Sequence, residues 1–214
     1  MVEVTNSSVT SNIMRHVVTV LDGPVKVVLI ALLIISLVMV GGLIAEYFQR
    51  KYINVKAVSV IDAIKKGVND PATIIKNSSL LLDQKRLLLE LTVHRALSPE
   101  MKENFAASLI DNYNQNLDFT IRKSDLIIKL GPTFGLLGTL IPLGPGIIAL
   151  ASGDTMTLSN SLLAAFDTTV IGLVSASICT IISLIRRRWY SKDRVMLTLI
   201  MEAVLESEKK NGGK

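Results

Sequence analysis

A run of 19 residues without a charged side chain constrains this chain more than any other feature. It covers residues 27–45 and reads VVLIALLIISLVMVGGLIA. About 20 residues, at a rise of 1.5 Å each, cross a hydrocarbon core of roughly 30 Å. The run is longer than the apolar part of a secretory signal, and Glu46 and a basic stretch follow it. We therefore predict a membrane-spanning helix over residues 25–47.

The composition agrees with an integral membrane protein. Half of the 214 residues are hydrophobic, the mean hydropathy is +0.48 and the net charge is +5. Apolar residues gathered into long runs exclude a disordered chain, a disulfide scaffold and an ordinary soluble enzyme. The single Cys179 cannot form an internal disulfide. Because the basic residues flank the apolar runs, they indicate membrane topology, and we expect no nucleic acid partner.

Two further segments are long enough to span a membrane. Residues 130–153 lack any charge, but three prolines interrupt them. Such residues are tolerated inside a membrane where protein or a water-filled cavity satisfies the freed backbone groups. We predict a helix over residues 126–153 that faces other helices. Residues 155–185 carry Asp167 as their only charge, and three arginines follow, so we predict a third span over residues 158–187.

The distribution of Lys and Arg predicts the orientation. Basic residues are concentrated in residues 48–125 and 188–214 and are sparse in residues 1–24 and in the turn between the last two spans. The N-terminus is expected outside, and both basic segments are expected in the cytoplasm. In residues 1–24 we expect a short amphipathic helix that ends at Gly23-Pro24.

The cytoplasmic segments read as helices. Asp70-Pro71 and Ser98-Pro99 are typical helix starts, and the second of these helices can run directly into the second span. The fold class is therefore an all-α membrane protein with three transmembrane helices and a cytoplasmic bundle formed by long helix extensions. We expect the charges of this bundle to form a solvated face. His16 and His94 are isolated, so we expect no metal site, cofactor or catalytic site.

Hydroxyl and carboxyl groups inside the spans are the informative side chains, because their burial without a partner is costly. Thr139 lies near the middle of the second span, and two prolines close by leave backbone carbonyls without a helical N–H. Water can fill such a polar notch. Alternatively, Thr139 bonds back to its own helix and the small residues serve only close packing. The residues that we expect to pack closely or to kink these spans are Gly135, Gly138, Pro142, Pro145, Gly146, Gly172 and Ala176.

The third span carries Asp167, Thr168 and Thr169 in succession. Residues two apart on a helix lie about 200° apart, so Asp167 and Thr169 cannot face the same lumen. Thr169 shares a face of small residues with Gly172 and Ala176. Asp167 is either an ionisable relay or a structural carboxylate that bonds a neighbouring helix or subunit. We expect no basic residue of the spans to pair with it.

Two segments resemble the MotA/TolQ/ExbB proton-channel family. They are GLLGTL over residues 135–140 and LLAAFDTTVIGL over residues 162–173. The layout is also similar, with one span, a long cytoplasmic helical loop, two spans joined by a short outer turn, and a cytoplasmic helix. GLLGT followed at this distance by a Thr-x-x-Gly span is a fairly specific combination.

The resemblance implies a homopentamer around single-span partner helices similar to ExbD, TolR or MotB, in which a partner Asp accepts the proton. Thr139 and Thr169 match the pore threonines of the family, and Thr168 and Asp167 are the next candidates for the ion pathway. The implied protein is a stator or energy converter in the inner (plasma) membrane of a prokaryote. It converts the ion-motive force into work of the partner, as in protein transport, without enzymatic activity.

Two departures from the family pattern indicate a divergent branch. TolQ- and ExbB-like sequences have a small residue where Asp167 stands, and the PLGPG run over residues 142–146 is unlike the commoner continuation. Both suggest a different partner and a different ion, so H⁺ and Na⁺ both stay open. A non-conducting membrane scaffold that anchors a transport complex is the alternative. The two hypotheses differ in whether Thr139 and Thr169 meet on a shared polar interior.

Overall fold

Helices make up nearly all of the part of the chain that the computed structural model describes, which comprises residues 2–52, 57–66, 71–93 and 98–212. No strand occurs within these residues. Three helices are long and apolar enough to cross a membrane, over His16–Lys51, Glu100–Ala151 and Thr155–Ser207. The prediction of an all-α chain with three membrane-length helices is therefore confirmed. The helices are α1 (Val2–Tyr52), α2 (Ala57–Lys66), α3 (Pro71–Asn77), α4 (Leu82–Val93), α5 (Pro99–Ala151) and α6 (Thr155–Gly212).

The start of α5 follows the sequence signal. The backbone N–H of Met101 donates to Ser98 Oγ at 3.3 Å, and that of Lys102 donates to the Ser98 carbonyl at 2.9 Å, so Ser98 caps the helix. From there α5 runs without a break into the second predicted span and ends at Ala151. α3 likewise begins at the predicted Pro71, whereas its expected cap Asp70 lies outside the described residues.

The expected end of a helix at Gly23-Pro24 is wrong. α1 continues through Pro24 as one helix to Tyr52. Proline removes one backbone N–H and disturbs one turn, but it does not prevent the next turns from forming. Val25 and Leu29 follow directly and are buried in a hydrophobic cluster, so continuing the helix gains apolar burial that offsets the lost hydrogen bond.

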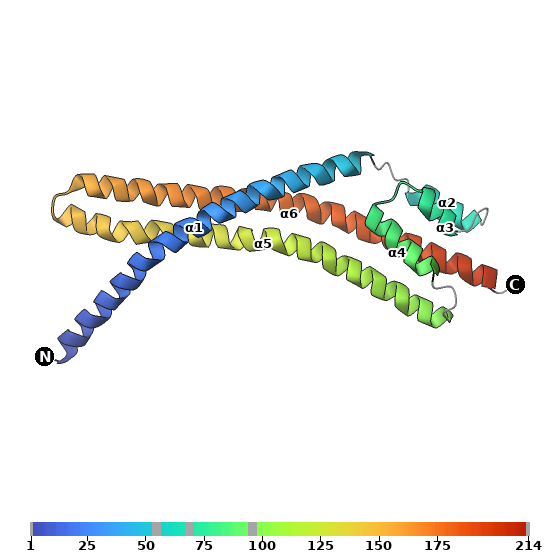
Figure 1. Cartoon of the computed structure of the whole chain (residues 1–214), viewed down its shortest axis with the longest axis horizontal. Coiled ribbons are helices and arrows are strands. Elements are labelled where there is room, and N and C mark those ends of the chain that lie inside the picture. Colours follow the sequence, from blue (N-terminus) through green and yellow to red (C-terminus); the bar gives the residue numbers. More distant parts are fainter. Residues whose placement is uncertain (1, 53–56, 67–70, 94–97, 213–214) are drawn as a thin grey trace. The chain divides into compact units, whose positions relative to one another are not determined.

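The chain divides into two compact units, which are described separately. The first comprises Met1–Gly42 and Arg122–Ser183. Here α5 and α6 form an antiparallel hairpin, visible at the yellow and orange end of the chain in Figure 1. The tight turn between them requires Gly153, whose φ of +80° favours glycine. Asp154 then caps α6, because Thr157 donates its backbone N–H at 3.0 Å and its hydroxyl at 2.5 Å to the Asp154 carboxylate.

Helix α1 packs on one side of this hairpin. Two apolar clusters make the contact, one around Val25 and Leu29 and one around Leu32. These residues recur at helical spacing, so α1 presents one stripe to α5 and α6 and leaves its other faces exposed. The hairpin residues in the two clusters are Ile127, Ile128, Leu130, Phe134, Leu137, Ile141, Ile171 and Cys179.

The second unit comprises Leu43–Ile121 and Leu184–Lys214. It is a helical bundle in which α2, α3 and α4 share one apolar core with the first part of α5 and the last part of α6. Ser78 ends α3 by donating its hydroxyl to the Ile75 carbonyl at 2.6 Å. Buried members of the core include Val60, Ile64, Ile75, Leu80, Leu88, Leu91, Leu109, Tyr113, Leu197, Ile200, Met201 and Val204.

Candidate functional site

The two spans that carry the predicted site approach each other through glycines. A Cβ atom added at Gly131 would lie 2.6 Å from the carbonyl oxygen of Gly172, and one at Gly138 would lie 2.7 Å from the Cβ of Thr168. Since real Cβ atoms essentially never come within 3.0 Å of such neighbours, only glycine fits at these positions. The backbones of α5 and α6 are therefore in close contact over several turns.

The predicted packing residues divide between this contact and the rest of α5. Gly135 lies beside Gly172, and Gly146 lies beside Ser161, where an added Cβ would be 2.9 Å from the serine Cβ. Ala176 is buried opposite Gly131. Pro142 and Pro145 lie inside α5, which continues as a helix through both of them.

Thr168 belongs to the same contact. Its side chain is 6% exposed and lies against Gly138, and its hydroxyl donates to the Ala165 carbonyl at 2.9 Å and is 3.3 Å from that of Ala164. A hydroxyl enclosed between two helices of one chain is not available to line a pathway outside them. Thr168 therefore lies in the α5–α6 contact, and its role in an ion pathway stays a prediction.

Thr139 and Thr169 lie on a common side of the hairpin. Thr139 follows Gly138, and Thr169 follows Thr168, so each comes directly after a residue of the α5–α6 contact. Two residues after each threonine comes an isoleucine that packs toward α1: Ile141 follows Thr139, and Ile171 follows Thr169. Residues two apart are about 200° apart on a helix. Both threonines therefore point away from α1, at the opposite edge of the α5–α6 pair.

Both threonine hydroxyls bond back to their own helices. Thr139 Oγ1 donates to the Leu136 carbonyl at 2.6 Å, and Thr169 Oγ1 donates to the Ala165 carbonyl at 3.3 Å. Each hydroxyl oxygen keeps lone pairs with which it can accept a hydrogen bond from water. In addition, Pro142 and Pro145 supply no N–H to the carbonyls one turn earlier. The edge of the hairpin that carries the two threonines therefore offers two hydroxyl acceptors, whereas the carbonyls freed by the prolines belong to Gly138 in the α5–α6 contact and to Ile141, which packs toward α1.

Asp167 does not join these threonines. Its side chain is exposed, and it lies about 200° around α6 from Thr169. No hydrogen bond or ion pair joins it to any residue of the described part of the chain. The structure therefore brings Thr139 and Thr169 to one edge of the α5–α6 pair and places Asp167 elsewhere.

The second unit contains a network of charges that the sequence did not reveal. Arg50 donates to Asp193 at 2.6 and 3.1 Å and to Glu46 at 3.3 Å, while Arg186 donates to Glu46 at 3.2 Å. Asp193 is 4% exposed and Arg186 is 8% exposed. The expectation that all charges of this unit form a solvated face is therefore wrong. The i,i+4 spacing of Glu46 and Arg50 was a local signal, but their partners on α6 are far away in the sequence.

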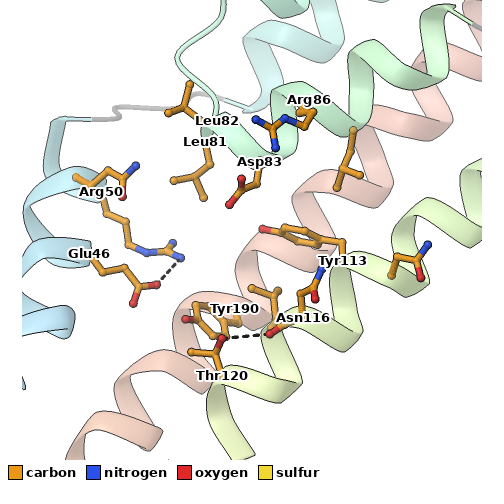
Figure 2. Close-up of a pocket in the computed structure, with 14 residues that line it drawn as sticks. Glu46, Arg50, Leu81, Leu82, Asp83, Arg86, Tyr113, Asn116, Thr120 and Tyr190 are labelled. Atoms are coloured by element: carbon orange, nitrogen blue, oxygen red, sulfur yellow. Dashed lines mark hydrogen bonds and ion pairs between the residues drawn. The ribbon is translucent and has the colours of Figure 1, made fainter. Parts of the chain in front are cut away.

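A cavity of about 550 Å³ lies beside this network. Figure 2 shows the Arg50 guanidinium, the Asp83 carboxylate and the Tyr113 ring around it, with Glu46 and Tyr190 at its edge. Acidic and basic groups are balanced in the lining, and nothing in it resembles a nucleophile–base pair. Among the described residues, no group of three His, Cys, Asp or Glu side chains is arranged to hold a metal ion.

Residues 63–197 match the MotA/TolQ/ExbB proton channel family. The chain belongs to this family. The match extends from α2 into the second half of α6 and contains all of the glycine contact between α5 and α6, together with Thr139, Asp167 and Thr169. It makes the chain a membrane protein of a channel-type family, one whose members work with single-span partner proteins. No individual curated protein matches the chain.

Proposed function

We propose that this chain is one subunit of an oligomeric proton channel that converts the ion-motive force into movement of a single-span partner protein. The observation that carries the proposal is the common position of Thr139 and Thr169. In a chain of the MotA/TolQ/ExbB family, both threonines lie at the edge of the α5–α6 pair that α1 does not cover.

The chemistry of this edge suits a proton pathway. A threonine hydroxyl both donates and accepts hydrogen bonds, so it can hold a chain of water molecules or a protonated carboxylate of the partner. It adds no fixed charge that would trap the ion. One charge that crosses 100 mV yields about 2.3 kcal/mol, so the work of several protons must be combined to move the partner through one step.

In the proposed assembly, five copies of the chain surround the partner helices, with Thr139 and Thr169 of each copy on the inside and α1 on the outside. The partner carries the acidic residue that accepts the proton. We place the chain in the inner (plasma) membrane of a prokaryote, with its N-terminus outside and its C-terminus in the cytoplasm. The basic residues of the second unit support this orientation.

One observation favours a second candidate, a non-conducting membrane scaffold. Both threonine hydroxyls donate to carbonyls of their own helices, as packing hydroxyls commonly do. A scaffold needs the close α5–α6 contact but no water at Thr139 and Thr169. The two candidates therefore differ in whether water reaches these positions in the assembled complex.

Cysteine labelling in intact membranes distinguishes them. The variants Thr139→Cys and Thr169→Cys, made in a Cys179→Ser background, are exposed to a small water-soluble thiol reagent while the chain is expressed with its single-span partner. Ile141→Cys is the matched control, because Ile141 packs toward α1. The channel predicts labelling of both threonine positions and not of the control. Protection of both positions, in a complex shown to be assembled, supports the scaffold.

A further inference from the structure

A polar contact joins α5 and α6 at a second level of the hairpin. Ser183 donates its hydroxyl to Asp125 Oδ1 at 2.9 Å, between residues that are 58 positions apart in the sequence. Ser183 is 4% exposed and Asp125 is half-buried, and both belong to the first unit. The pair of helices that carries Thr139 and Thr169 therefore also holds a carboxylate.

This contact lies in register with the two threonines. Fourteen residues separate Asp125 from Thr139 on α5, and fourteen separate Thr169 from Ser183 on α6. Side chains two heptads apart return to the same face of packed helices, and on a straight helix they differ by only about 40°. Because α5 and α6 are antiparallel, the two intervals run side by side (Figure 1). The contact therefore lies at the edge that carries the threonines, about 21 Å along the helix axis from them.

The buried hydroxyl of Ser124 indicates water at the level of this contact. Ser124 comes seven residues before Gly131 and fourteen before Gly138, so it continues the row of α5 residues that face α6. It is 0% exposed, and its Oγ has no hydrogen-bond partner within the described part of the chain. Burial of a hydroxyl without a hydrogen bond is costly, and buried water molecules commonly satisfy such groups.

Thr180 occupies the interval between the two levels on α6. It comes eleven residues after Thr169, which places it within about 20° of that residue around the helix. Its side chain is exposed, and its hydroxyl donates to the Ala176 carbonyl at 2.8 Å. The hydroxyl oxygen keeps lone pairs that can accept from water. Hydroxyl groups therefore recur along this edge from Thr169 to Ser183.

We infer that Asp125 is the proton acceptor at the cytoplasmic end of the ion pathway and that Ser183 positions its carboxylate. The inference rests on the proposed function. The carboxylate takes a proton from the water molecules along the threonine edge and releases it to bulk water in the cytoplasm. Asp125 thereby returns to its charged form, and one proton has crossed. Asp125 directly precedes the predicted span over residues 126–153, so its charge does not have to be held in the hydrocarbon core.

Asp125→Asn distinguishes this role from that of a contact that only fastens α5 to α6. The asparagine oxygen can still accept from Ser183, but the amide does not take up a proton in this range of pH. Proton flux is measured as dissipation of a pH gradient in liposomes that contain the chain and its single-span partner. Asp111→Asn is the matched control, because Asp111 is an exposed carboxylate of α5 that accepts from Gln115 of its own helix at 2.9 Å.

We expect Asp125→Asn to reduce the flux toward that of protein-free liposomes while assembly and the midpoint of thermal unfolding are unchanged. Asp111→Asn should conduct like the wild type. Wild-type flux in Asp125→Asn would overturn the inference.

Chemical restoration of the carboxylate tests the inference within one preparation. Asp125→Cys in the Cys179→Ser background is divided in two, and modification is verified by mass spectrometry. Iodoacetate attaches a carboxymethyl group, whereas iodoacetamide attaches the corresponding neutral amide. We expect flux to return only after treatment with iodoacetate. No return of flux, or an equal return with both reagents, would show that the carboxylate of Asp125 does not carry the proton.

The threonine variants separate this inference from the proposed function. If Thr139→Val and Thr169→Val lose flux but Asp125→Asn retains it, only the role of Asp125 is wrong. If the assembled wild type does not conduct, the proposed channel is wrong and the role of Asp125 is wrong with it.

Discussion

The glycine contact between α5 and α6 predicts a specific sensitivity at Gly131. In Gly131→Ala, the new methyl group would lie 2.6 Å from the Gly172 carbonyl oxygen and 3.1 Å from the Ala176 Cβ. The nearest atom belongs to the backbone, so relief requires α5 and α6 to separate. Overpacking of this kind costs about 1–3 kcal/mol, whereas alanine gains up to about 1 kcal/mol over glycine in helix propensity.

Gly144→Ala is the matched control in the same helix. No atom of the chain lies within 4 Å of a Cβ added at Gly144, so this variant gains the propensity without a clash. In equilibrium unfolding of the purified protein in mixed detergent micelles, Gly131→Ala should therefore be less stable than Gly144→Ala by about 1–3 kcal/mol. Equal stability of the two variants would refute the close contact between α5 and α6 at this position.

Two further predictions concern charged side chains outside the glycine contact. Asp193→Ala leaves the half-buried Arg50 without its main partner and should lower the free energy of unfolding by about 2–3 kcal/mol. Asp118→Ala removes a partly exposed ion pair with Arg194 and should lower it by less than about 1 kcal/mol. Equal losses of stability in the two variants would contradict the Arg50–Asp193 network. At the start of α6, the hydroxyl and then the backbone N–H of Thr157 hold the pKa of Asp154 below its ordinary value. The ionised carboxylate accepts these hydrogen bonds, so the backbone amides in the first turn of α6 should be protected from hydrogen exchange at neutral pH. Their protection should fall as the pH drops through the lowered pKa of Asp154. In Asp154→Asn the protection should no longer depend on pH.

The sequence predicts features that depend on neighbouring residues better than features that depend on distant ones. The start of α5 follows from Ser98 and Pro99, because a cap acts within one turn. The continuation of α1 through Pro24 could not be predicted, because burial of the following turn against α5 and α6 decides it. For the same reason periodicity on α6 excludes Asp167 from the face of Thr169 but does not show which faces of α6 meet another helix.

The common position of Thr139 and Thr169 likewise required the structure. Helical spacing gives the angle between residues of one helix, but it does not say which faces of two helices meet. The contact of Gly138 with Thr168 and the packing of Ile141 and Ile171 toward α1 supply this information.

In the proposed channel, ions pass along the edge of the hairpin that carries Thr139 and Thr169. The most direct test reconstitutes the chain with its single-span partner in liposomes and measures the dissipation of a pH gradient. Thr133→Val is the matched control, because the Thr133 hydroxyl also bonds back to its own helix but lies on another face of α5. We predict that Thr139→Val and Thr169→Val each reduce proton flux to that of protein-free liposomes, while Thr133→Val conducts like the wild type. Wild-type flux in both threonine variants, with assembly verified, would contradict the account.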